Sequence, residues 1–230
     1  MNKTLPPQLL KITGFAIVEN VFDEVEIEAM LQLISEKYPP AQSHFALRCL
    51  LLTIPTLQEK LWNDKFISLL HSFSPDYQLV RAIYFDKPPS SNWVVNWHQD
   101  LTLNLKEKRE VEGFRHWLPK ENYYSVQPPQ KYLDNLLTFR IHLDDCTAQN
   151  GALRVIPESH REIRQMKSLP SSYWEKAEVC EVKKGGIFMM KPLLWHSSKR
   201  TENQQSRRVI HLEFSSLKLP DKLTFYERSK

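Results

Sequence analysis

From residue 79 onward, short runs of β-branched and aromatic residues recur between turn-forming residues, and this pattern limits the fold more than any other feature. Such runs are typical of β-strands. A parallel α/β sheet would need a helix between successive strands, and the sequence shows no such alternation. The pattern favours a mainly β, double-stranded β-helix (jelly roll, cupin-like). The predicted strands are residues 79–85, 93–97, 101–105, 136–143, 152–156, 179–182, 187–190 and 207–214.

The first third of the chain carries helical signals instead. Asp23 is a plausible N-cap for a helix that runs to Lys37, and Thr56 with Glu59 resembles a capping box for a second one. The first helix would bury one face: Ile27, Met30, Leu31 and Ile34. We therefore expect a single domain over residues 1–230, with a helix-rich flank (1–75) and a jelly-roll core (79–216).

Composition excludes several function classes. The 230 residues include 31 Lys and Arg against 27 Asp and Glu, giving +4 with the signs interspersed, so the charge pattern of a nucleic-acid-binding protein is missing. Three cysteines without C-x-x-C spacing argue against a disulfide framework and a cysteine zinc site. The sequence has no signal-peptide core and no apolar segment long enough to span a membrane. We expect a cytoplasmic protein without a membrane partner.

Two segments are singled out by their turn and loop residues. The step Lys184-Gly185-Gly186 predicts a tight hairpin turn between two strands, because glycine tolerates positive φ. Residues 106–131 are charged, aromatic and proline-containing, and they resist assignment to regular structure. Their aromatic side chains favour a lid over the site, and packing of an insertion is the alternative. These side chains are Phe114, Trp117, Tyr123 and Tyr124.

The candidate metal ligands lie at strand ends. His98 and Asp100 can face the same side, since alternate residues of a strand do so, and His196 follows about a hundred residues later. Two imidazoles and one carboxylate on one face of an octahedral ion are typical of non-haem Fe(II) oxygenases. A second triplet, His142 to Asp144, satisfies the same spacing. From spacing alone, the choice between the two triplets stays open.

Three blocks in this order resemble the phytanoyl-CoA dioxygenase family of Fe(II)/2-oxoglutarate-dependent oxygenases. They are Trp97-His98-Gln99-Asp100, residues 150–160 (NGALRVIPESH), and residues 192–198 (PLLWHSS) followed by Arg207-Arg208. The likeness extends from about residue 81 to residue 214. It implies Fe(II) held by His98, Asp100 and His196, with His142 and Asp144 as neighbours only.

The resemblance also implies how 2-oxoglutarate binds. Arg207, eleven residues after the distal histidine, would hold the far carboxylate, while Ser198 and Gln99 would lie near the co-substrate. Strand alternation then turns Arg208 to the opposite face. Arg140 is either a second anion contact or a buried partner of Asp144. His211, on the same face as Arg207, is expected to form a supporting hydrogen bond.

The function implied is hydroxylation of a small-molecule substrate with O2, releasing succinate and CO2. The sequence does not identify the substrate, and it contains no motif that indicates a CoA-binding site. Two alternatives remain: a metal-dependent isomerase or hydrolase on a cupin-like barrel, and a non-catalytic binding module. Arg207 at the family spacing argues against the first, and a complete ligand set argues against the second. Asp100 favours hydroxylation over halogenation, because halogenases of the family replace this carboxylate.

Overall fold

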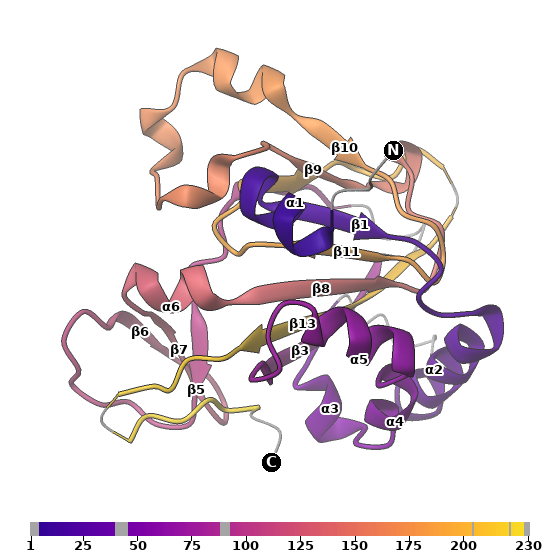
Figure 1. Ribbon diagram of the computed structural model, residues 1–230, viewed down its shortest axis with the longest axis horizontal. Coiled ribbons are helices and arrows are strands. Elements are labelled where there is room, and N and C mark those ends of the chain that lie inside the picture. Colours follow the sequence, from indigo (N-terminus) through magenta and orange to yellow (C-terminus); the bar gives the residue numbers. More distant parts are fainter. Residues whose placement is uncertain (1–4, 40–45, 88–92, 204, 221, 228–230) are drawn as a thin grey trace.

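The computed structural model describes residues 5–39, 46–87, 93–203, 205–220 and 222–227, and in it two antiparallel sheets face each other (Figure 1). Helices cover the outer face of the larger sheet, and a small third sheet lies beside it. No helix in the described part of the chain is long and apolar enough to cross a membrane.

The larger sheet has six strands, each antiparallel to its neighbours. In spatial order they are β1 (Phe15–Val18), β11 (Ile187–Met190), β8 (Leu137–His142), β13 (Arg207–Ser215), β3 (Gln78–Lys87) and β2 (Ala46–Arg48). Strands β8 and β13 lie at its centre, so their inward side chains form the floor of the interior.

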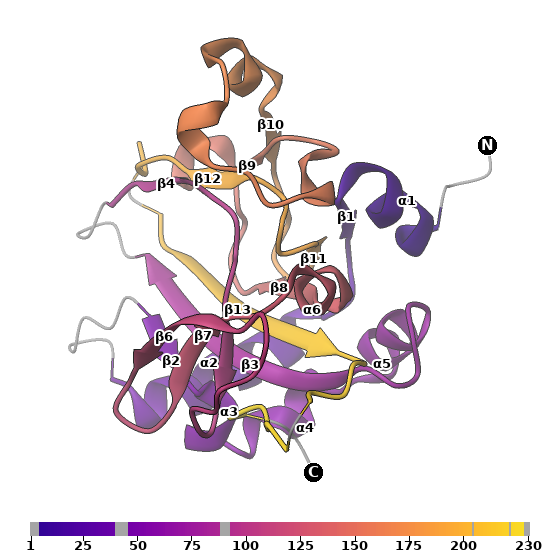
Figure 2. The same ribbon diagram turned by 90° about the vertical axis from the view of Figure 1, so that its left-hand side faces the viewer.

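The smaller sheet lies across the interior from these central strands (Figure 2). Its order is β10 (Glu178–Cys180), β9 (Leu153–Val155), β12 (His196–Ser198) and β4 (Val95–His98). One apolar cluster joins the sheets face to face, because it combines Leu153 and Val155 of the smaller sheet with Phe188 and Met190 of the larger. This is the predicted jelly roll, and the fold class is confirmed.

Most of the described α-helices lie in the first third of the chain, which also supplies β1 and β2. The helices are α1 (Pro6–Thr13), α2 (Glu24–Lys37), α3 (Leu50–Thr53), α4 (Leu57–Leu61) and α5 (Asp64–His71), and α6 (Gln130–Asn135) follows later. Asp23 caps α2 in a capping box with Glu26. The proposed cap at Thr56 is wrong, because its side chain makes no capping hydrogen bond and its backbone is already helical.

The helices pack on the outer face of the larger sheet because its strands alternate. On β13, Ile210, Leu212 and Phe214 belong to the same buried cluster as α2 to α5. The intervening β13 side chains face the other sheet. Phe66 of α5 joins the layers, with its ring 5.4 Å from that of Phe139.

The interpretation of residues 106–131 as irregular is corrected. They contain β6 (Arg115–Pro119) and β7 (Tyr124–Gln127), and β7 pairs with both β6 and β5 (Leu103–Leu105). A separate apolar cluster, including Phe114 and Val126, lies beneath this three-stranded sheet. The insertion is thus a folded element that packs on an apolar cluster separate from the main core.

The turn at residues 184–186 forms, but it does not make a hairpin. Gly185 has φ +80°, and Gly186 donates a backbone hydrogen bond to Lys183. The strands on either side belong to different sheets, since β10 pairs with β9 and β11 pairs with β1 and β8. The turn therefore passes the chain from one sheet to the other.

Candidate metal centre

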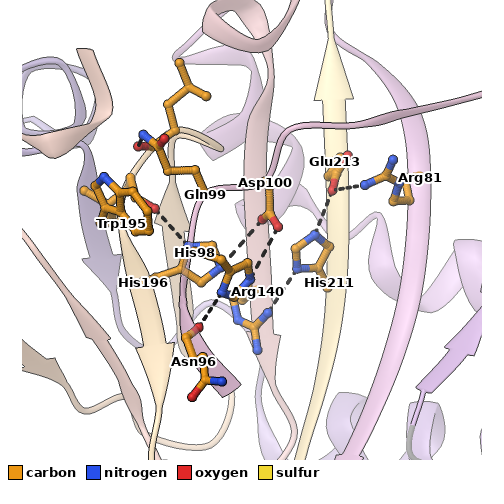
Figure 3. A network of polar contacts seen from close by, with 12 residues as sticks. Arg81, Asn96, His98, Gln99, Asp100, Arg140, Trp195, His196, His211 and Glu213 are labelled. Carbon is orange, nitrogen blue, oxygen red and sulfur yellow. Dashed lines mark hydrogen bonds and ion pairs between the residues drawn. The ribbon is translucent and has the colours of Figure 1, made fainter. Parts of the chain in front are cut away.

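The two candidate histidine ligands meet because β4 and β12 are neighbours in the smaller sheet. His98 and His196 are direct partners in the register, and their ring centroids are 4.1 Å apart. Strand β4 ends at His98, so Asp100 reaches the site from the segment that follows rather than by strand alternation. Its backbone N–H donates to the Pro192 carbonyl at 2.8 Å, which fixes this segment. Figure 3 shows the three side chains converging.

In both histidines the Nδ1 atom is hydrogen-bonded, which leaves the Nε2 atom free for a metal. His98 Nδ1 lies 2.8 Å from the Asn96 carbonyl oxygen, and His196 Nδ1 lies 2.8 Å from that of Leu194. A carbonyl only accepts, so each Nδ1 carries the proton and each Nε2 presents its lone pair. Each Nε2 is 3.7 Å from an oxygen of Asp100, and one donor atom from each residue lies within 4.8 Å of the others. This donor set fits a divalent first-row metal ion.

The charge states also suit a metal site. Burial lowers the pKa of His196 to about 4, although Asp100 opposes this shift, so the imidazole is neutral at physiological pH. For Asp100, burial acts to raise the pKa, but the facing His196 and His98 outweigh it and the pKa is lowered. His196 therefore presents a neutral imidazole and Asp100 an ionised carboxylate, the forms that bind metal.

The alternative triplet does not assemble. His142 is buried on β8 in the larger sheet, and Asp144 turns outward to Arg208. Both Arg208 Nε and Nη2 donate to the Asp144 carboxylate, at 2.9 and 2.6 Å. Among the described residues, only His98, Asp100 and His196 form a metal-competent group.

A pocket of about 270 Å³ opens beside the three ligands, between the two sheets. Arg207 enters it from β13 and is 5% exposed, while Arg140 enters from β8 and is 7% exposed. Arg207 Nε and Nη1, and Arg140 Nε, are buried without a hydrogen-bond partner among the described residues. Guanidinium N–H groups that are buried without an acceptor are costly, so this pocket is suited to an anion. Its lining also includes several apolar side chains: Ala46, Phe85, Trp93, Val95 and Leu153.

A chain of three side chains supports Arg140 (Figure 3). Arg140 Nη1 donates to His211 Nδ1 at 3.0 Å, because arginine has no acceptor. His211 Nε2–H then donates to Glu213 at 3.0 Å, and Arg81 donates to the same Glu213 oxygen at 2.9 Å. This arrangement fixes His211 as one neutral tautomer. The Arg140–Asp144 pairing considered from the sequence is wrong, while the expected supporting role of His211 agrees with these contacts.

The two remaining predicted contacts differ in position. Ser198 is buried on β12 and lines the pocket. Gln99 does not line it. Its amide nitrogen donates to the carbonyls of Leu193 and Glu162, at 2.6 and 2.8 Å, and its oxygen accepts from the Arg164 N–H at 3.0 Å. Gln99 therefore ties the segment between the first two ligands to the loop before His196.

The role of Arg81 was not predicted from the sequence, although the alternating residues of β13 indicate that a partner is needed. Glu213 shares the inward face with Arg207 and His211, and a buried carboxylate there needs a partner. The register pairs Glu213 with Arg81 of β3, which supplies one. No local pattern marks Arg81, because its partner is distant in the sequence.

Fold and site together define a class of protein: a double-stranded β-helix with a two-histidine, one-carboxylate site and an arginine-lined pocket beside it. The phytanoyl-CoA dioxygenase (PhyH) family matches residues 11–209. The chain belongs to this family of Fe(II)- and 2-oxoglutarate-dependent oxygenases, as the sequence motifs predicted.

Solved structures with the same fold include several enzymes. AviO1 from Streptomyces viridochromogenes Tue57 is 18% identical, with a TM-score of 0.66 and coverage of 96% of this chain and 99% of that one. The epimerase SnoN, in complex with Fe3+, alpha ketoglutarate and nogalamycin RO, is 12% identical, with a TM-score of 0.70 and coverage of 91% and 82%. EctD from S. alaskensis, with 2-oxoglutarate and 5-hydroxyectoine, is 15% identical, with a TM-score of 0.66 and coverage of 91% and 74%. No curated protein sequence matches this chain.

Proposed function

We propose that this protein is an Fe(II)- and 2-oxoglutarate-dependent dioxygenase that hydroxylates a small molecule and releases succinate and CO2. One observation supports the proposal most: the guanidinium of Arg207, whose Nε and Nη1 are buried without a partner among the described residues, lies in the same pocket as the three candidate metal ligands. A metal site alone fits many activities, whereas an arginine fork beside it suits a dicarboxylic co-substrate.

The ligands His98, Asp100 and His196 would hold Fe(II) on one face and leave the opposite positions open. When bound with 2-oxoglutarate, the iron supplies the activation of O2 that hydroxylation of an unactivated carbon requires. The protein supplies geometry: the two Nδ1 hydrogen bonds to backbone carbonyls hold the imidazoles in orientation.

The co-substrate would be held by its far carboxylate. Arg207 is the principal contact in this proposal, and Arg140 and Ser198 lie in the same pocket. Arg140 is kept in place by His211. The aromatic and aliphatic wall of the pocket excludes water, which strengthens the charge-assisted hydrogen bonds to the carboxylate.

The competing classes are weakened by the same arginines. A cupin-like isomerase or hydrolase has no use for two buried guanidinium groups beside its metal, and a binding module does not need all three ligands. The neighbours include an epimerase and a carbocyclase, so the outcome of oxidation varies within this fold. Hydroxylation is our proposal for this chain, and the carboxylate at Asp100 favours it over halogenation.

The test is an anaerobic titration of the protein with Fe(II) and 2-oxoglutarate, followed by visible absorption spectroscopy. We expect the charge-transfer band of a chelated keto acid, and its loss when Arg207 is replaced by alanine at limiting 2-oxoglutarate. Metal binding without this band in the wild-type protein would contradict the proposal and favour the isomerase or hydrolase class.

A further inference from the structure

A second, larger pocket of about 740 Å³ adjoins the metal site. The two pockets share Phe85, Asp100 and His211, so the metal ligand Asp100 lies where they meet. The larger one is bounded by β2, β3 and β13 on one side and by the β6–β7 turn on the other. A molecule in this pocket can place a carbon beside the metal while 2-oxoglutarate occupies the arginine-lined pocket.

The wall of this second pocket is polar. Only Leu52, Ile83 and Phe85 have pure hydrocarbon side chains among its lining residues. Ligand pockets are usually lined mainly by apolar side chains with a few polar groups, so this lining is unusual.

Several of its polar groups are available to a ligand. The side chains of Arg48 and Lys120 make no hydrogen bond or ion pair with any residue in the described ranges, and neither does Glu121. The hydroxyl groups of the lining Thr102, Tyr123, Ser125 and Tyr226 are likewise unengaged by described residues. In contrast, Arg81 and Glu213 are already paired with each other. The free charges are therefore two cations against one anion.

These groups discriminate between substrate classes. An acyl chain would cover the Ser125 and Thr102 hydroxyls without replacing their hydrogen bonds to water, which opposes binding. A hydrophilic molecule replaces those hydrogen bonds, and an anionic group on it pairs with Arg48. The tilted stack of Tyr123 on Tyr226, with ring centroids 5.0 Å apart, adds a rigid aromatic surface at the same wall.

Resting on the proposed function, we propose that the substrate is a compact, hydroxyl-rich small molecule with an anionic group, and not a fatty acyl thioester. Arg48 binds the anionic group, and the hydroxyl-bearing side chains bind the remainder. The carbon to be oxidised then lies at the Asp100 edge of the pocket.

The experiment measures succinate formation by the Fe(II)-loaded protein with 2-oxoglutarate and O2. The first set of additions consists of small molecules from the source cells, which are freed of lipids and acyl thioesters and separated by anion exchange. The lipid extract and palmitoyl-CoA are added in parallel assays. We expect the retained, anionic fraction to raise the rate. The Arg48→Ala protein should need about tenfold more of this fraction for the same rate, as expected for one lost charge-assisted contact. Arg115→Ala, on exposed β6 outside the pocket, is the matched control and should behave as wild type.

Stimulation by the lipid extract, by palmitoyl-CoA or by the unretained neutral fraction would overturn the proposal. The proposal would also be overturned if none of the additions raised the rate. The proposed function is judged separately, by the charge-transfer band and the succinate formed without any addition. An intact band together with stimulation by palmitoyl-CoA would thus reject the substrate class and keep the dioxygenase.

Discussion

Two adjacent arginines on β13 have opposite surroundings. Arg207 points between the sheets, where burial lowers its pKa and where Nε and Nη1 have no described partner. Arg208 points to the other side and forms a two-point contact with Asp144. The alternation of side chains along this strand, as predicted from the sequence, agrees with the placement of the two arginines. Their substitution should therefore separate co-substrate binding from stability.

We predict that Arg207→Ala raises the 2-oxoglutarate concentration required for half-maximal succinate formation by at least about tenfold, since a charge-assisted bidentate contact is worth roughly 1.5 to 3 kcal/mol. Arg208→Ala should leave this concentration nearly unchanged. It should lower the free energy of unfolding by about 1 to 2 kcal/mol, because Asp144 loses both guanidinium hydrogen bonds. Succinate assays and urea unfolding of both variants are the measurements. A larger co-substrate effect at Arg208 would show that the strand register is wrong by one residue.

The two histidine triplets give a second pair of variants. His98→Ala should lose bound iron and 2-oxoglutarate decarboxylation, because two ligands hold the ion much less tightly than three. His142→Ala should keep its iron, because His142 lies on β8 away from the ligand cluster. Iron content after dialysis and circular dichroism of both proteins are the readouts. Normal iron in the first variant with loss in the second would reverse the assignment.

Substitution of Gln99 distinguishes a role in positioning backbone segments from a direct contact with 2-oxoglutarate. If it positions backbone segments, Gln99→Leu leaves the Arg164 N–H and two carbonyls without their partner, which destabilises the protein by about 2 to 4 kcal/mol. Iron affinity should fall by about 10- to 100-fold, as for other groups that orient metal ligands. Unfolding curves and iron titration measure both effects. An unchanged stability with a raised 2-oxoglutarate requirement would instead support the direct contact expected from the family resemblance.

At the scale of elements, the β6–β7 turn makes most of the insertion's contribution to the proposed substrate pocket. Lys120, Glu121, Asn122 and Tyr123 line it, while residues 106–112 do not. We predict that hydrogen exchange at residues 120–125 slows when Fe(II), 2-oxoglutarate and the stimulating metabolite fraction are added together. Residues 106–112 provide the internal control. Equal exchange at 120–125 with and without the fraction would identify the insertion as a static element and reject the lid.

For the molecule as a whole, one buried carboxyl group makes stability depend on pH. Burial raises the pKa of Glu227 from 4.5 to about 7, although the Ala82 N–H and Arg81 act in the opposite direction. Its Oε2 accepts from Ala82 N–H at 3.0 Å, and Oε1 is buried without a described partner. Between these two pKa values the folded protein binds more protons than the unfolded chain, so the free energy of unfolding falls as pH rises through this range.

We predict that Glu227→Gln removes this dependence, because the amide keeps an acceptor for Ala82 without ionising. Relative to wild type, the variant should gain about 1 to 3 kcal/mol of stability between roughly pH 5 and pH 8. Urea unfolding at both pH values measures this difference. Glu112→Gln, on the surface, controls for the change in net charge. A difference between Glu227→Gln and wild type that is the same at both pH values would contradict the assignment.

The sequence by itself determined the features that depend on local pattern. Strand periodicity identified most of the jelly-roll strands, and side-chain alternation placed Arg207 inward with Ile210 and Leu212 outward. Ordered motifs identified the family, and with it they predicted the ligands His98, Asp100 and His196, whose side chains lie together in the structure. Such inferences are possible because alternation and motif spacing are properties of neighbouring residues.

Only the tertiary structure decided the features that depend on segments distant in the sequence. Both histidine triplets had workable spacing, and the pairing of β4 with β12 places one of them beside His196. The partner of Asp144 is Arg208 and not Arg140, and Gln99 binds backbone segments instead of lining the pocket. The second, polar pocket combines β2, β3 and β13 with the β6–β7 turn, and no local pattern marks it. Such contacts follow from how strands pair across the sheets, which a single strand's pattern does not specify.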